Sequence, residues 1–389
     1  MRTRNLIFFA VLSALIIFVP FSEYGTTCLA QDTELYPVRV NGKEGYIDAT
    51  GRIVITPQFS SAHFFSEGLA CVSSKEGFAW IDRTGKQVIA PQFNCITGEG
   101  AFHEGLAVIC VGDRKGYIDK TGKIVINPQF DTAWPFSEGL ASVGVGVSYD
   151  GQIGFIDRTG RFVINPQFNY FFTEHEFSEG LLCVKIEKGD FGTYRFLDNT
   201  GQDYFNYPFD DAHGFSEGLA CVRKGNQRGF IDKSGKFVFY CPKDGYYHPF
   251  KEGMSRFSIS KYEYVDGEDY PVLTEEKTGF INMAGKCVIE PYFYEADDFS
   301  EGVACVRIGG KYGKGRYGFV DKSGSFTINP QYDYADSFRG GIAPVVINNQ
   351  FQYINKNGDI IWTSMELPSY ISSSIEGVIR MEEYNKYRK

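Results

Sequence analysis

One short pattern recurs nine times along this chain. It reads Asp-x-Thr/Ser-Gly-Lys/Arg in its clearest copies and begins with Asn in two others. The copies start at Asp48, Asp82, Asp119, Asp157, Asp198, Asp232, Asn282, Asp321 and Asn355. Their spacings are 34, 37, 38, 41, 34, 50, 39 and 34 residues. A period in this range predicts an array of small structural units rather than one irregular globule.

Each unit is predicted to be a three-stranded antiparallel meander. In the third unit the β-rich segments are residues 106–109, 116–119 and 123–126. A hairpin joins the first two segments, and the repeated turn joins the second to the third. Pro128 is expected to end the third strand, because proline cannot donate a hydrogen bond to a strand ladder.

The repeated turn is expected to serve the fold. Its first side chain can accept a hydrogen bond from the backbone two residues on, and its glycine supplies a positive φ. A residue present in every unit is more simply explained by structure than by a ligand. The structural turn residues predicted in this way are Asp48, Gly51, Asp82, Gly85, Asp119, Gly122, Asp157, Gly160, Asp198, Gly201, Asp232, Gly235, Gly285, Asp321, Gly324 and Gly358.

The third strands are apolar at successive positions, as at residues 53–55 and 124–126, which indicates that both sheet faces are covered. Neighbouring meanders must therefore pack face to face. The first and last units both begin with the first strand of the repeat, at residues 35–40 and 342–347. No strand is therefore left over at either end to close a ring. The predicted fold is all-β: tandem meanders in an open superhelical solenoid, with a closed β-propeller-like ring as the alternative.

Two further segments recur between the units. One is Pro-x-Phe/Tyr, and the other is Phe-Ser-Glu-Gly at residues 65–68, 136–139, 177–180, 215–218 and 299–302, with variants at 102–105 and 250–253. The phenylalanines are predicted to fill the seam between units. The aligned glutamates suggest an acidic site, but a turn residue at the entry to a strand is the simpler interpretation.

The two ends of the chain differ from residues 31–365, which hold the nine repeats. Residues 1–30 are predicted to be a signal peptide cleaved after Ala30, because two arginines precede a 14-residue apolar run that is short for a membrane span. Lipidation at Cys28 is disfavoured by Gly25. Residues 366–389 are predicted to be a capping tail with a short helix, since apolar residues recur there at helical spacing.

Charge and cysteine content exclude some classes of function. The net charge of −9 comes without a basic cluster, so no nucleic-acid partner is expected. No second long apolar run follows the first, so no transmembrane segment is expected in the mature chain. Cys71, Cys183, Cys221 and Cys305 share one repeat position and are expected to be buried apolar side chains.

Candidate binding residues are sought where the units differ. The position two before the Phe of Phe-Ser-Glu-Gly carries four of the five histidines. It reads His63, Gly100, Trp134, His175, His213, His248, Asp297 and Asp336. Along one rim these would form a stripe suited to metal or to pH-dependent binding of an acidic ligand. Equivalent atoms in packed sheets lie about 10 Å apart, so no metal site is predicted. The alternatives are a polar loop multiplied by duplication and histidines buried in the seam.

The hairpin between the first and second strands also varies. It is longest at residues 260–278, where the insert is acidic and contains Tyr262, Tyr264 and Tyr270. Insertions gathered on one edge of an array indicate a binding edge, and exposed tyrosine is common in binding surfaces. Tolerated growth of a surface loop is the alternative.

No motif of a known catalytic or cofactor site is found. Gly-x-Ser-x-Gly, P-loop, His-Glu-x-x-His and EF-hand patterns do not occur, and no carboxylate stands out from its repeat siblings. We therefore predict that the protein is not an enzyme and has no catalytic residues, metal or cofactor. The alternatives are a β-repeat hydrolase acting on glycans and a purely structural envelope protein.

The units resemble the bacterial WG-repeat (KWG-type) family, whose core runs Lys-Trp-Gly-Tyr-Ile-Asp-x-x-Gly-Lys. Residues 45–48, 116–119, 154–157 and 318–321 match it, although the Trp is missing and residues such as Glu44 stand in its place. The resemblance implies an exported or surface β-repeat protein with no catalytic residues to transfer. We expect a periplasmic, cell-surface or secreted scaffold that binds protein or polysaccharide through its variable hairpin loops.

Overall fold

The structure is a computed structural model that describes residues 34–93, 95–146, 151–169, 175–188, 191–242, 245–264, 272–309 and 315–371. The predicted signal peptide and most of the predicted tail helix lie outside these residues. Within them, no helix is long and apolar enough to cross a membrane. Glu34–Lys389 is one compact unit, and its described residues form nine antiparallel sheets.

The sheets follow one another in chain order. The first contains β1 (Tyr36–Val40), β2 (Lys43–Ile47) and β3 (Ile53–Phe59). The next three are β4 (Ser61–Ala62), β5 (Leu69–Ser74), β6 (Gly77–Asp82) and β7 (Gln87–Phe93); β8 (Cys95–Ile96), β9 (Leu106–Val111), β10 (Arg114–Asp119) and β11 (Ile124–Phe130); and β12 (Thr132–Ser137), β13 (Leu140–Val145), β14 (Gln152–Ile156) and β15 (Phe162–Asn169). A 3-10 helix, η1, spans Gly98–Gly100.

The second half continues the pattern. Its sheets are β16 (Leu181–Lys188) and β17 (Phe191–Asp198); β18 (Asp211–Ala212), β19 (Ala220–Lys224), β20 (Gln227–Ile231) and β21 (Phe237–Tyr240); β22 (Gly245–Tyr247), β23 (Met254–Glu263), β24 (Val272–Asn282) and β25 (Cys287–Phe293); β26 (Glu295–Ala296), β27 (Val303–Ile308), β28 (Arg316–Asp321) and β29 (Phe326–Tyr332); and β30 (Tyr334–Ala335), β31 (Ile342–Ile347), β32 (Gln350–Asn355) and β33 (Ile360–Ser364).

Most units have four strands where the sequence predicted three. The fourth strand is innermost and in most sheets short, such as β4 with two residues, and it comes from the polar segment before Phe-Ser-Glu-Gly; β12, with six residues, is longer and extends into that segment. Two residues are too few to give an alternating pattern, so the sequence carries no signal for this strand. The meander of the three longer strands is present as predicted, with β5 paired to β6 and β6 to β7.

The third long strand differs from the prediction in two ways. It runs through its proline, because β11 ends at Phe130 and not before Pro128. β11 is the outer edge of its sheet, where proline loses no ladder hydrogen bond. Its apolar run is also not covered on both faces: Ile124 is 39% and Val125 is 42% exposed, whereas Ile126 is 2% exposed. Only Ile126 of these three residues therefore packs in the seam between sheets.

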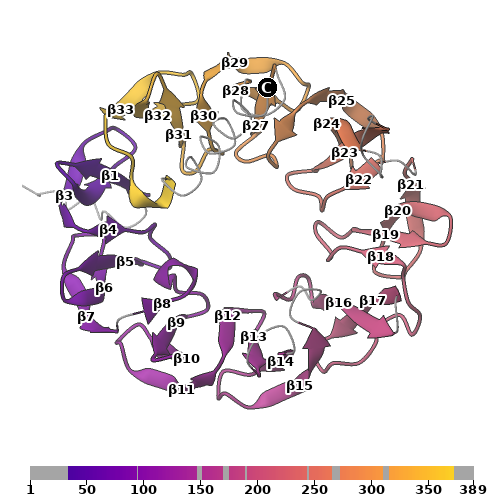
Figure 1. Ribbon diagram of the computed structural model, residues 1–389, viewed down its shortest axis with the longest axis horizontal. Helices are drawn as coiled ribbons and strands as arrows, with labels where there is room; N and C mark the ends of the chain where they lie inside the picture. The colour runs from indigo at the N-terminus through magenta and orange to yellow at the C-terminus, as the bar shows by residue number, and fades with distance from the viewer. Residues whose placement is uncertain are drawn as a thin grey trace, which may run out of the picture. The chain divides into compact units, whose positions relative to one another are not determined.

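The sheets form a closed ring, a β-propeller (Figure 1). The first sheet packs against the last: Tyr36 and Val38 of β1 share a buried cluster with Ile342 and Phe351. The Tyr36 hydroxyl donates to the Arg339 carbonyl over 2.8 Å. The prediction of an open solenoid is therefore wrong. That prediction assumed that a ring closes only when the first and last sheets share a strand. In this ring the two sheets share no strand, and side-chain contacts and the C-terminal segment join them.

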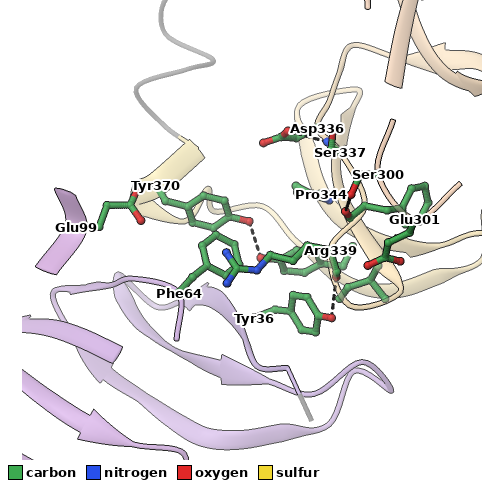
Figure 2. Close-up of a pocket in the computed structure, with 13 residues that line it drawn as sticks. Tyr36, Phe64, Glu99, Ser300, Glu301, Asp336, Ser337, Arg339, Pro344 and Tyr370 are labelled. Atoms are coloured by element: carbon green, nitrogen blue, oxygen red, sulfur yellow. Dashed lines mark hydrogen bonds between the residues drawn. The ribbon is translucent and has the colours of Figure 1, made fainter. Parts of the chain in front are cut away.

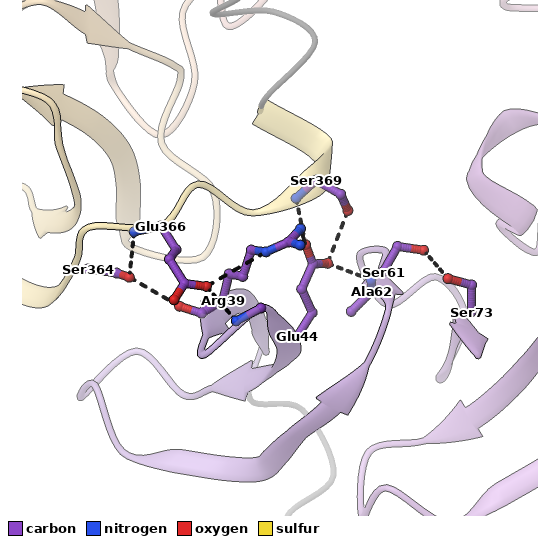
Figure 3. A network of polar contacts seen from close by, with 9 residues as sticks. Arg39, Glu44, Ser61, Ala62, Ser73, Ser364, Glu366 and Ser369 are labelled. Carbon is purple, nitrogen blue, oxygen red and sulfur yellow. Dashed lines mark hydrogen bonds and ion pairs between the residues drawn. The ribbon is translucent and has the colours of Figure 1, made fainter. Parts of the chain in front are cut away.

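Glu44 holds this closing seam, by which we mean the contact of the first sheet with the last sheet and residues 365–371. Its carboxylate is 0% exposed and accepts hydrogen bonds from the Ala62 amide over 2.6 Å and the Ser369 amide over 2.7 Å. Arg39 donates to the same carboxylate over 3.3 Å and also approaches Glu366 at 3.8 Å (Figure 3). Glu44 therefore joins the first sheet to the second sheet and to the C-terminal segment.

A belt of glutamates joins successive sheets. Each glutamate of Phe-Ser-Glu-Gly, or of its variants, has a positive φ between 49° and 55° and offers its carboxylate to the glycine amide of the next copy. The seven pairs are Glu67–Gly105, Glu104–Gly139, Glu138–Gly180, Glu179–Gly218, Glu217–Gly253, Glu252–Gly302 and Glu301–Gly341. These glutamates are thus turn residues, and their carboxylates tie neighbouring sheets together.

The repeated Asp turns face the same belt. Asp119 Oδ1 accepts from the Thr121 amide over 2.9 Å and from the Lys123 amide over 3.1 Å, and Gly122 has a φ of 83°. The same bonds recur at Asp48, Asp82, Asp157, Asp198, Asp232 and Asp321. Lys120 of this turn pairs with Glu67 of the preceding copy at 3.0 Å. The turns therefore lie at the same end of each sheet as the glutamates.

The core is divided among the seams. Each Phe of Phe-Ser-Glu-Gly packs against the aromatic residue of the preceding sheet's middle strand, as Phe136 does on Tyr117 with ring centroids 5.0 Å apart. Burial is complete at both, with exposures of 2% and 0%. Cys71, Cys183, Cys221 and Cys305 are buried, as their apolar repeat position suggested, and Cys110 is disulfide-bonded.

Candidate functional site

The varied position before Phe-Ser-Glu-Gly lies on the inner wall of the ring. Five of its residues immediately follow the short innermost strands β4, β18, β22, β26 and β30, which face the centre in Figure 1, and Trp134 lies within the innermost strand β12. The backbone of these five residues pairs with the next strand in the same way: the His63 amide donates to the Cys71 carbonyl, the His213 amide to the Cys221 carbonyl and the Asp297 amide to the Cys305 carbonyl, over 2.9–3.0 Å. The structure therefore brings the predicted stripe onto one surface.

One arc of this wall is aromatic. Trp134 and His175 stack with ring centroids 3.7 Å apart and an angle of 12°. Farther along, Tyr246 contacts both His213 and His248, with centroids 5.3 and 4.9 Å apart. These two groups of aromatic contacts lie on the part of the ring between sheet β12–β15 and sheet β22–β25.

Burial keeps these histidines neutral. Desolvation lowers the pKa of His175 and of His248 to about 4, and it also lowers the pKa of His213. Histidines that titrated near 6.5 would gain charge between pH 7 and 5.5, but His175 and His248 do not. This geometry favours the alternative in which the histidines belong to the seam over the one in which they form an acid-activated anion site.

A second arc is acidic. Asp297 and Asp336 line a cavity of about 220 Å³ between the last two sheets, together with Glu295, Cys305, Tyr317 and Tyr334. Asp297 is exposed by surface area, yet desolvation by the surrounding protein and the nearby Asp336 raise its pKa to about 6. Among the described residues, no group of three or more His, Cys, Asp or Glu side chains is placed to hold a metal ion.

A larger cavity lies at the closing seam, and we call it the closing pocket. Its volume is about 560 Å³, within the usual range for ligand sites. It is lined by Tyr36, Phe64, Glu99, Ser300, Glu301, Asp336, Ser337, Phe338, Arg339, Ile342, Pro344, Tyr353 and Tyr370 (Figure 2). The pocket thus combines residues from the first, second, third and last two sheets with the C-terminal segment, and ring closure creates it.

Arg339 organises the floor of the closing pocket. It takes the serine place of Phe-Ser-Glu-Gly in the last unit, and its guanidinium lies 4.4 Å from the centroid of the Phe64 ring. It donates to the Phe65 carbonyl over 3.3 Å and pairs with Glu34 at 2.9 Å. The Arg339 guanidinium therefore already has a hydrogen-bond acceptor, an ion-pair partner and a ring contact within the protein. The sequence missed this residue, although the departure at residues 338–341 from the repeated tetrad was a usable signal.

The other pocket residues carry no sequence signal. Tyr36 lies in β1, Phe64 follows β4 and Tyr370 belongs to the C-terminal segment, so they are far apart along the chain. The Tyr353 hydroxyl donates to the Pro37 carbonyl over 3.0 Å and also contacts the Tyr370 hydroxyl, which fixes the aromatic wall. Of the residues predicted from the sequence, only Asp336 lines this pocket.

The predicted hairpin surface lies at the opposite end of its sheet from the glutamate belt. β23 and β24 have 10 and 11 residues, whereas β27 and β28 of the next sheet have six each. Tyr262 is 59% and Tyr264 is 80% exposed on this extension. Tyr270 lies outside the described residues. The two described tyrosines are accessible to a partner, and the residues that line the closing pocket belong to other sheets.

The comparisons with known proteins identify the repeat. A family model described as "WG containing repeat" matches residues 45–77, 78–114, 116–146, 153–189, 209–227, 279–312 and 317–351, which together make up more than half of the chain. No curated protein sequence matches the chain.

Several solved structures match the chain at low similarity. Apo AztD from Citrobacter koseri has a TM-score of 0.37 and 12% identity, covering 85% of this chain and 94% of that one. An uncharacterised Listeria monocytogenes protein has 0.38 and 12%, covering 78% and 93%. A prolyl endopeptidase has 0.39 and 10%, covering 86% and 50%. At these TM-scores the likenesses say nothing about what this chain binds.

Proposed function

This chain belongs to the WG-containing repeat family, and we propose that it is an exported, non-catalytic scaffold that binds a protein or polysaccharide partner through its variable hairpins. The proposed export follows from the apolar run after Arg2 and Arg4. The proposed binding role follows from the closed ring, whose sheets carry hairpins of different length at one end.

The observation that carries this proposal is the β23–β24 extension. It projects Tyr262 and Tyr264, which are 59% and 80% exposed. Lys261 and Glu263 form an ion pair at 2.7 Å beside them. Tyrosine offers a large contact area at a small cost in side-chain entropy, and mixed charges beside it provide polar contacts at the rim of an interface.

The test compares partner recovery by three proteins. Wild type, the double variant Tyr262→Ser/Tyr264→Ser, and Tyr292→Ser are immobilised and exposed to cell-envelope extract and, separately, to insoluble envelope polysaccharide. Tyr292 is a matched control, because it is 58% exposed but lies on the outer strand β25. We expect the double variant alone to lose the partner. Equal recovery by all three proteins would contradict a binding role for this hairpin.

A glycan hydrolase is the second candidate, and one observation favours it. The closing pocket brings together carboxylates from unlike repeat positions: Glu99, Glu301 and Asp336. Glycoside hydrolysis commonly uses two such groups on opposite sides of the scissile bond. However, the Glu301 carboxylate already accepts from the Gly341 amide over 3.1 Å and pairs with Lys356 at 3.2 Å. Reducing ends released by wild type and lost in Asp336→Asn would replace the non-catalytic proposal.

A further inference from the structure

The glutamate belt is interrupted at one place in the ring. The last copy of Phe-Ser-Glu-Gly, at residues 338–341, has Gly340 where the other copies have glutamate. This copy therefore has no carboxylate to offer to the sheet that follows it in the ring. A Cβ at Gly340 would lie 2.3 Å from the Tyr36 hydroxyl, so a glutamate does not fit while β1 packs there. The contact that ties the second sheet to the last, one after another, is thus missing between the last sheet and the first.

No backbone connection joins the two sheets at this junction. Neighbouring sheets elsewhere are consecutive in the sequence, whereas the first and last sheets are the two ends of the array. Two guanidinium groups share one carboxylate here, since Arg339 pairs with Glu34 at 2.9 Å and Arg83 approaches it at 3.8 Å. Arg339 is half exposed, and water screens such ion pairs. The closing seam therefore needs further contacts to stay closed.

Residues 365–371 supply polar contacts to the first sheet. The Ser369 amide and hydroxyl donate to the buried Glu44 carboxylate over 2.7 and 3.0 Å (Figure 3). The Glu366 carboxylate accepts from the Gly42 amide over 2.7 Å. Arg39 lies between the two carboxylates, 3.3 Å from Glu44 and 3.8 Å from Glu366. The segment thus binds the first sheet through charged hydrogen bonds.

The same segment makes apolar contacts to the second and last sheets. The Tyr370 ring meets Phe64 edge to face with centroids 4.8 Å apart. Its hydroxyl shares a hydrogen bond of 2.5 Å with the Tyr353 hydroxyl. Ile371 is 1% exposed and packs in the same cluster as Tyr36. Seven residues at the end of the described chain therefore hold three sheets together where the belt is absent.

We propose that residues 365–371 are a latch: when they come away from the ring, the closing seam opens and the belt keeps the other sheets together. The segment can detach without unfolding a sheet, because it begins after β33, which ends at Ser364. Sheets in such an array are stabilised by their nearest neighbours, so one open junction leaves the others in place. Opening would expose Tyr36, Val38 and Phe351, which are buried in the seam. The latch does not depend on the hairpin of the proposed function, so either proposal can fail alone.

Hydrogen–deuterium exchange of the full mature chain at pH 7 tests the latch, because the exchange rate of a backbone amide reports the opening of the structure around it. The variant Glu366→Ala/Tyr370→Ala removes latch contacts to all three sheets. We expect amides of β1, β2 and β31 to exchange at least about tenfold faster than in wild type, and amides of β9 and β10 to keep their rate. An equal increase in both groups would mean general destabilisation and would overturn the latch. Unchanged rates in β1, β2 and β31 would overturn it as well.

Met365→Ala is the matched control within the latch, since the Met365 side chain is 73% exposed, and it is expected to leave all rates unchanged. Two truncated chains then define the latch. A chain that ends at Ile371 should exchange like wild type, and one that ends at Ser364 should exchange like the double variant. Fast exchange of β1 and β2 in both truncated chains would show that residues after 371 close the ring and would refute the latch. Loss of protection in β9 and β10 of the shorter chain would refute a separate opening of the seam.

Discussion

Glutamate is an unusual choice for a left-handed backbone position, and this chain uses it at seven sheet junctions. A non-glycine residue at positive φ costs on the order of 1 kcal/mol. The cost is offset because the carboxylate accepts the glycine amide of the next copy, as Glu179 does from Gly218 over 3.0 Å. Lys233 adds an ion pair to Glu179 at 3.2 Å. The repeated glutamate is therefore explained by assembly of the ring.

Removing one belt carboxylate should weaken the ring measurably. We expect Glu179→Ala to lower the free energy of unfolding by about 1–3 kcal/mol, because a charged hydrogen bond to a backbone amide is lost. Glu76→Ala, in an exposed hairpin turn, is the control and should change it by less than about 0.5 kcal/mol. Chemical denaturation of both variants measures the difference. Equal effects would show that the belt contributes nothing.

The turn glycines make a second contact between sheets. A Cβ on Gly122 would lie 2.7 Å from Ile89 of the preceding sheet, whereas one on Gly139 would meet nothing within 4 Å. Both residues have a φ of 83°, so alanine strains the backbone equally at each. We expect Gly122→Ala to lower the melting temperature more than Gly139→Ala does. Identical melting temperatures would mean that the seam tolerates the added methyl group.

At the scale of elements, the long strands could be predicted and the short ones could not. The hydrophobic runs and the Asp turns locate β5, β6 and β7 in the sequence. β4 has two residues and is recognised only by its pairing with Val72 and Ser73. The wrong expectation for Pro128 arose because the sequence does not say which strand is the edge. For the same reason the sequence did not predict that Ile124, on the outer strand, is partly exposed.

The inner-wall elements should respond to acid in two opposing ways. Burial lowers the pKa of His175 and His248 to about 4. Between pH 6.5 and 4 the unfolded chain therefore takes up protons that the folded chain refuses, and stability falls as pH falls. Asp297 has the opposite sign, because its raised pKa of about 6 makes the folded chain hold a proton that the unfolded chain releases, and stability falls as pH rises through this range.

Thermal unfolding at pH 7 and pH 5 separates these contributions. From pH 7 to pH 5, the melting temperature of the variant His175→Gln/His248→Gln should fall less than that of wild type. His103→Gln is the control, since His103 is exposed in the glutamate belt and should leave the difference unchanged. Asp297→Asn should make this fall in melting temperature larger, because it removes the group that stabilises the fold when protonated. A difference that is the same in all four proteins would show that the inner-wall groups do not couple to folding.

At the scale of the whole molecule, ring closure could not be read from the repeats. Closure depends on Glu44, Tyr36, Arg339 and the segment from Glu366 to Ile371, none of which follows the repeated pattern. The closing pocket was missed for the same reason, because its residues come together only when the ends meet. The sequence placed Asp336 in the predicted stripe along one rim, but its position in the closing pocket depends on the ring.

The buried carboxylate of Glu44 should be the most sensitive single position at the seam. It accepts from Arg39, Ala62 and Ser369 and is 0% exposed. We expect Glu44→Ala to lower the free energy of unfolding by about 3 kcal/mol or more, because buried donors lose their acceptor. Denaturant unfolding against wild type measures this. An effect as small as that of Glu76→Ala would mean that the closing seam does not support the fold.

The most direct test of the ring is a zero-length cross-link between its ends. Arg39 approaches Glu366 at 3.8 Å, and the variant Arg39→Lys places an amine beside that carboxylate. Carbodiimide treatment of the monomer, followed by peptide mass spectrometry, should give an amide between residues 39 and 366, alongside the neighbour links Glu67–Lys120 and Glu179–Lys233. Recovery of the neighbour links without the 39–366 link would contradict the closed ring and favour an open array.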